Sequence, residues 1–123
     1  MTSNRIISLS ALLMSLAVMI GAFGAHALEE VVSAERLETW ETAVLYHFIH
    51  ALALLLIGIL RKDDSAKQLN WATYLMLSGI LIFSGSLYLL VLTDTSWLGA
   101  ITPIGGISFI AAWSLLALHY FRK

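Results

Sequence analysis

The sequence predicts an all-α integral membrane bundle of four transmembrane helices, forming a single domain over residues 1–123. The first observation is the composition, 59% hydrophobic and 12% charged, about half the charged fraction of an ordinary soluble domain. The second is that the apolar residues fall into four stretches, at residues 6–28, 40–60, 71–92 and 98–121. Each stretch has about the 20 residues that a helix needs to cross roughly 30 Å of hydrocarbon. An open sheet is excluded because its edge groups would lack hydrogen-bond partners in lipid.

The first stretch has two features of a signal peptide. Arg5 precedes the apolar run, and Ala25-His26-Ala27 fits a small-x-small cleavage pattern. The run is longer than a usual signal core, however, and it contains small residues suited to helix packing. We therefore expect it to be retained as the first span.

Basic residues predict the orientation of the spans. Of the seven lysines and arginines, only Arg36 falls on the side of the membrane opposite the termini. Because short basic loops stay in the cytoplasm, both termini are predicted to be cytoplasmic. Four aromatic residues are expected at the two membrane interfaces: Trp40 and Trp97 outside, and Trp71 and Tyr120 inside.

Polar residues at the ends of the stretches predict where three helices begin. Ser33 can cap a helix that runs directly into the second span, and Asn70 can cap the third. Thr102 followed by Pro103 is typical of an N-cap with proline in the first helical position. Residues 98–101 would then form a short approach to the fourth span.

Small residues predict which sides of the helices pack together, since helices in lipid associate through close backbone contact. The first span has a bulky sector and small residues on its other sides, which predicts that it is the central helix. The second span places Ala43, His47, His50, Ala51 and Gly58 on one face. The predicted packing residues are Ala17, Gly21, Gly24, Ala43, Ala51, Ser78 and Gly85.

Three histidines form a candidate polar site inside the membrane: His26, His47 and His50. His47 and His50 are three residues apart, so they share a helix face, and ionisable groups within a span are functional candidates. The leading interpretation is that neutral histidines hydrogen-bond neighbouring helices. The alternatives are a proton or ion pathway, and a metal or haem site. His119, near the cytoplasmic end, is interpreted as an interfacial residue.

No catalytic motif is present, so no enzymatic activity is predicted. The sequence has neither a glycine-rich phosphate loop nor a Gly-x-Ser-x-Gly elbow. It contains no cysteine, which excludes thiolate chemistry. No basic cluster indicates a nucleic-acid partner, and no cofactor is predicted.

Four segments resemble the YgdD/YwdK-type family of small multi-pass inner-membrane proteins, one in or beside each span. They are GAFGAH at 21–26, WETAV at 40–44 followed by Tyr46 and His50, FSGSLY at 83–88 and TPIGG at 102–106. The resemblance implies a bacterial cytoplasmic-membrane location and no assigned activity. The family pattern often has glutamine at the position of His47, which disfavours a three-histidine metal site and leaves His26 and His50 as the better pair.

The leading functional hypothesis is a non-enzymatic membrane component that binds a partner protein, a lipid or another copy of itself. One alternative is a small proton- or ion-linked transporter or channel, with His26 and His50 lining the path. Another is a haem- or metal-binding redox protein that uses the same histidines. The expected partners are the lipid bilayer and a second copy or another membrane protein.

Overall fold

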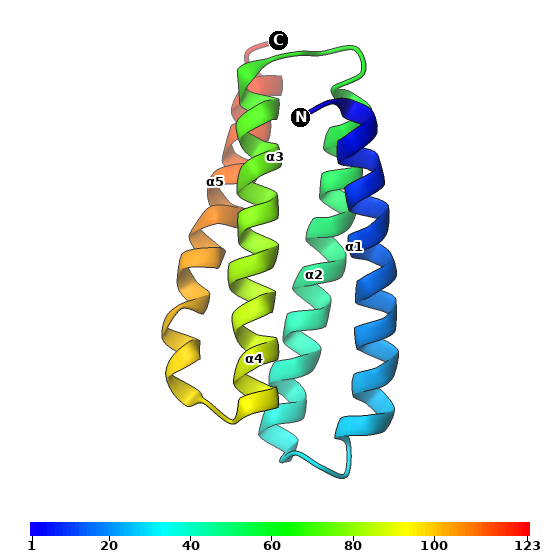
Figure 1. Cartoon of the computed structure of the whole chain (residues 1–123). Helices are drawn as coiled ribbons and strands as arrows, with labels where there is room; N and C mark the ends of the chain where they lie inside the picture. Colours follow the sequence, from blue (N-terminus) through cyan, green and yellow to red (C-terminus); the bar gives the residue numbers. More distant parts are fainter.

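Four long helical spans make up the computed structural model, which describes residues 1–123 and contains no strand (Figure 1). The first span is α1 (Ser3–Phe23) with a π-helical turn at Gly24–Leu28, and the second is α2 (Ala34–Leu60). The third joins α3 (Lys67–Gly79) to α4 (Gly85–Thr93) through a second π-helical turn at Ile80–Ser84. The fourth is α5 (Thr102–Phe121), preceded by a 3₁₀ turn at Ser96–Ala100. The predicted fold class is confirmed.

The spans are long enough to cross a membrane and extend beyond its hydrocarbon. They contain 26, 27, 27 and 26 residues, which at 1.5 Å per residue gives about 40 Å each. The hydrocarbon core is about 30 Å thick, so roughly 10 Å of each helix lies among the headgroups. Both termini lie at the same end of the bundle (Figure 1).

The first span lies at the edge of the bundle and not at its centre. α1 packs mainly on α2 and α2 packs on the third span, while α5 packs on the third span and also reaches α2, where Phe109 and Trp113 contact His50. The prediction that the first span is central is therefore wrong. Its small residues permit close approach by a neighbour, but they do not determine how many neighbours the helix has.

The second span buries the face that the sequence predicts. All five residues of that face are buried, while Leu45, Leu52, Leu56 and Ile59 on the other side are exposed. Around it, Ile6, Ile57 and Met76 belong to one apolar core, and Trp40 and Leu87 belong to a second core. The two cores lie towards opposite ends of the bundle.

Two of the predicted helix starts need correction. The Ser33 side chain accepts from the Arg36 N–H and caps α2, as expected. The third span instead begins at Lys67, because Asn70 lies inside the helix and its Oδ1 accepts from the Arg61 guanidinium at 2.7 Å. In the fourth span Thr102 is the first helical residue rather than the cap, although the short approach before it is present.

Trp40 faces the interior of the bundle and not the surrounding lipid. It is 4% exposed, and its indole N–H donates to the Ile20 carbonyl at 3.2 Å. A Cβ atom on Gly24 would overlap the indole ring, so the glycine provides the space in which Trp40 packs. Trp71 and Trp97, by contrast, are exposed.

Candidate functional site

His50 is held by hydrogen bonds on both ring nitrogens. Its Nδ1 lies 2.7 Å from the carbonyl oxygen of Tyr46, and its Nε2 accepts from the Trp113 indole N–H at 3.2 Å. A carbonyl oxygen only accepts and an indole only donates. Together the two bonds require the neutral imidazole with its proton on Nδ1. The ring also stacks on Phe109 with centroids 3.4 Å apart, so His50 connects α2 to α5 and has no nitrogen free.

His47, one turn earlier on the same buried face, keeps one nitrogen free. Its Nδ1 lies 2.9 Å from the Tyr88 hydroxyl oxygen of α4. Its Nε2 is buried and makes no hydrogen bond of good geometry, although the backbone of Leu13 in α1 lies close to the ring. An unpaired buried polar atom costs about 1–3 kcal/mol. His47 is therefore the one residue of the histidine pair that can take up a further hydrogen bond.

His26 is separate from the other two histidines. It lies in the π-helical turn that ends the first span, and it is exposed. The structure thus brings together His47 and His50 on one face of α2 and does not bring His26 to them. No three His, Asp or Glu side chains lie close enough together to hold a metal ion.

Serine hydroxyls join the second span to its neighbours. Ser10 of α1 donates to the Ala51 carbonyl, and Ser84 donates to the Ala43 carbonyl, each at 2.8 Å. Both hydroxyls are fully buried. Because burying an unpaired hydroxyl is costly, these bonds stabilise the α1–α2 and α2–third-span contacts.

The predicted packing residues fall into two groups. Ala17, Gly24, Ala43 and Ala51 are buried between helices, whereas Gly21 and Ser78 are half-buried. Around Gly85 there is open space, since an added Cβ would meet no atom within 4 Å. The prediction that Gly85 is a packing residue needs correction. The buried side of the third span passes through Thr73, Met76, Ile80 and Ser84, and Gly85 lies on a different side of the helix.

Sequence reasoning missed three residues that the structure places at helix contacts. Tyr88 and Trp113 are the partners of the two histidines, and a Cβ on Gly105 would overlap the backbone of Phe83. Tyr and Trp within a span usually need a partner for their polar atom, which is a usable signal. Which histidine each one meets depends on the order of the helices and is not encoded locally.

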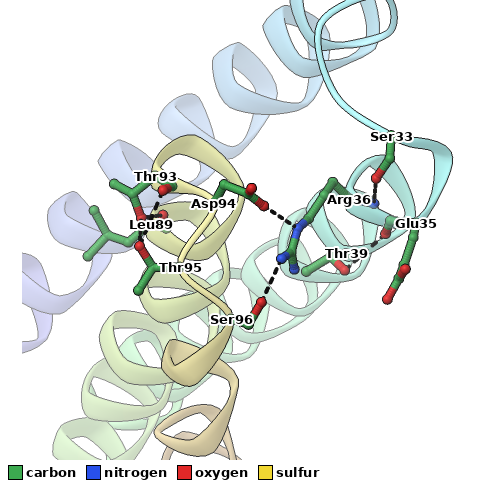
Figure 2. Close-up of polar contacts among 9 residues, drawn as sticks. All are labelled: Ser33, Glu35, Arg36, Thr39, Leu89, Thr93, Asp94, Thr95 and Ser96. Atoms are coloured by element: carbon green, nitrogen blue, oxygen red, sulfur yellow. Dashed lines mark hydrogen bonds and ion pairs between the residues drawn. The ribbon is translucent and has the colours of Figure 1, made fainter.

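A polar cluster closes the end of the bundle opposite the termini (Figure 2). The Arg36 Nε donates to Asp94 at 3.0 Å, and its Nη2 donates to Ser96 at 2.9 Å. Asp94 has a left-handed backbone with φ of 50° at the end of α4. The arginine thereby joins the start of α2 to the turn between α4 and α5, beside a hollow of about 520 Å³.

A second polar cluster closes the end that carries the termini. Asp64, in the loop between α2 and α3, accepts from Lys123 at 2.6 Å and lies 2.7 Å from the His119 Nε2. Hydrogen bonds from Lys123, from the Ala66 N–H and from His119 hold the pKa of Asp64 well below its usual range. The loop is thus attached to the C-terminal end of the chain.

These features define a four-span α-helical membrane protein whose interior polar groups bond mainly to one another. Residues 20–106 match the family model described as "Protein of unknown function (DUF423)". The UPF0382 membrane protein of Staphylococcus aureus (strain bovine RF122 / ET3-1) is 48% identical over 116 residues, covering 94% of each chain. The UPF0382 membrane protein YwdK of Bacillus subtilis (strain 168) is 46% identical over 104 residues, covering 84% of this chain and 85% of the relative.

The chain therefore belongs to the UPF0382 (DUF423) family of membrane proteins, and the resemblance inferred from the four segments is confirmed. No solved structure matches it.

Proposed function

We propose that the protein is a non-enzymatic component of the bacterial cytoplasmic membrane that associates with a second copy of itself through the outward face of α1. The observation that carries this proposal is the position of α1, which packs mainly on α2. A helix with small residues on two sides but one neighbour has a side free for a further helix.

The outward face of α1 carries a line of small and hydroxyl residues, flanked by the exposed Val18 and Met19. Ser8, Ala11, Ser15 and Ala22 lie on one side of the helix at helical spacing, and all four are exposed. Ala11 and Ser15 are four residues apart, the small-xxx-small spacing that lets helix backbones come close in lipid. Because a two-fold dimer joins identical patches, a second α1 offers a matching surface.

The interior supports the same proposal. His50 has both nitrogens engaged, and the buried serines bond to backbone carbonyls. Such groups stabilise the bundle and are not available to a substrate. The surface that remains open to specific contacts faces the membrane.

The proposal includes an orientation with both termini in the cytoplasm. The end of the bundle that carries the termini also carries most of the positive charge, from Arg5, Arg61, Lys62, Lys67, Arg122 and Lys123. This asymmetry supports a cytoplasmic position for that end.

The mass of the purified protein in mild detergent, measured by light scattering with the detergent contribution subtracted, tests the association. Wild type should be a dimer. Ala22→Leu places a bulky side chain on the outward face and should give a monomer of unchanged helix content. Ala117→Leu, at an exposed alanine of α5, is the matched control and should stay dimeric. A wild-type monomer, or equal effects of both variants, would contradict the proposal.

A second candidate function is proton-linked transport, favoured by the unpaired Nε2 of His47 inside the bundle. If His47 carries protons, proteoliposomes containing the wild-type protein should dissipate a pH gradient faster than empty vesicles. His47→Gln keeps a hydrogen-bonding group but removes the titratable ring, so it should abolish that difference. Flux equal to that of empty vesicles would eliminate this candidate.

A further inference from the structure

A groove of about 310 Å³ runs along the seam between the outer halves of α1 and α2. Gly21 and Ala25 line it from the first span, and Trp40, Val44 and Phe48 line it from the second. All of these are apolar or aromatic residues. The single charged residue in the lining is Glu41, which is exposed.

The groove extends from the membrane interface into the hydrocarbon. Glu41 lies 20 residues before Arg61 at the inner end of the same helix, a distance of about 30 Å at 1.5 Å per residue. This distance equals the hydrocarbon thickness, so Glu41 falls at the outer boundary with the headgroups. Phe48 lies seven residues deeper, which is about 10 Å into the acyl-chain region.

The end of the molecule at which the groove opens is acidic. Glu29, Glu30, Glu35 and Glu38 are exposed at the same end of the molecule. The one basic residue there, Arg36, is paired with Asp94. An anionic headgroup would be repelled at this position, whereas a headgroup with an ammonium group could donate hydrogen bonds to the Glu41 carboxylate.

We propose that this groove binds one acyl chain of a phosphatidylethanolamine molecule, with the ammonium of its headgroup at Glu41. The apolar wall explains why a hydrocarbon chain fills the space, and the depth of the groove suits a lipid that stands in the outer leaflet. Glu41 then selects the headgroup. This site uses the α1–α2 seam and is separate from the outward face of α1, so it does not depend on self-association.

The test is competitive lipid retention by the delipidated full-length protein in mild detergent. Equal amounts of phosphatidylethanolamine and phosphatidylglycerol with the same acyl chains are added, and bound lipids are counted by native mass spectrometry. Wild type should retain one phosphatidylethanolamine per copy in preference to phosphatidylglycerol. Ala25→Leu, which fills the groove from an exposed position, should lose both lipids.

Charge variants separate Glu41 from the general acidity of the outer surface. Glu41→Gln should lower the ratio of bound phosphatidylethanolamine to phosphatidylglycerol about 1.5- to fivefold, the value of an exposed ion pair. Glu38→Gln, which removes the same charge outside the groove, should leave the ratio unchanged. Equal effects of the two variants, phosphatidylglycerol binding as well as phosphatidylethanolamine in wild type, or full retention by Ala25→Leu would each overturn the proposal.

Discussion

Adding one methyl group at Gly105 tests how closely α5 packs against the third span. Gly105 is buried in the first turn of α5, and a Cβ atom there would overlap backbone atoms of Phe83. Backbone atoms cannot rotate away as a side chain can. Gly105→Ala must therefore move α5 outwards, which also strains the 2.6 Å hydrogen bond between Ser86 and Thr102.

The expected magnitude follows from three effects. Overpacking costs about 1–3 kcal/mol, and weakening a neutral hydrogen bond costs up to about 1 kcal/mol. Replacing glycine by alanine within a helix returns about 0.5–1 kcal/mol. Because overpacking is the largest of the three effects, Gly105→Ala should lower the free energy of unfolding by up to about 3 kcal/mol.

Gly106, the next residue, is the matched control. A Cβ there would meet its nearest neighbour, the Phe83 ring, at 3.9 Å, which is an ordinary contact. Gly106→Ala should leave stability unchanged or raise it by up to about 1 kcal/mol. Reversible unfolding in dodecylmaltoside–SDS mixtures, followed by tryptophan fluorescence, measures both variants. Equal stabilities would show that α5 does not approach the third span this closely.

Three further predictions use the same unfolding assay. Trp40→Phe removes the indole bond to the first span and should cost about 1 kcal/mol; a neutral result would contradict the buried bond. His50→Phe and Trp113→Phe each leave one partner of a buried bond unpaired, so each should cost about 1–3 kcal/mol, and the double variant should cost less than the sum; strict additivity would count against the contact. The pKa of Asp64 is lowered in the folded protein, mainly by Lys123. The ionised carboxylate therefore stabilises the folded protein at neutral pH, and this stabilisation is lost as the pH falls below about 4. Asp64→Asn should flatten that part of the curve of stability against pH, and an unchanged curve would refute the assignment.

Features that depend on a single helix were predictable from the sequence. Hydropathy alone located four spans, and the cap at Ser33 and the buried face of α2 followed from helical periodicity. Each rests on residues within about four positions of one another. Such patterns can be read from the sequence because the membrane thickness sets the length of each helix and the helix geometry sets the spacing of its side chains.

Features that depend on neighbours were not predictable in the same way. Gly24 and Gly85 look alike in the sequence, yet one faces the Trp40 ring and the other faces open space. Trp40 was expected at the outer membrane interface, but Gly24 of another span makes room to bury its ring. His50 was recognised as a buried polar residue, but its partner Trp113 lies on the fourth span. The order of the helices, which the sequence does not state, decides all three.

Disulfide crosslinking in native membranes tests most directly whether α1 carries a self-association surface. The chain contains no cysteine, so a single introduced cysteine can form a disulfide only with the same residue of another copy. Ser15→Cys lies on the outward face, and Leu16→Cys lies on the adjacent bulky sector; both positions are exposed. Mild oxidation should give a covalent dimer with Ser15→Cys and leave Leu16→Cys monomeric. A dimer only from Leu16→Cys, equal yields from both variants, or no dimer from either would contradict an interface on the outward face of α1.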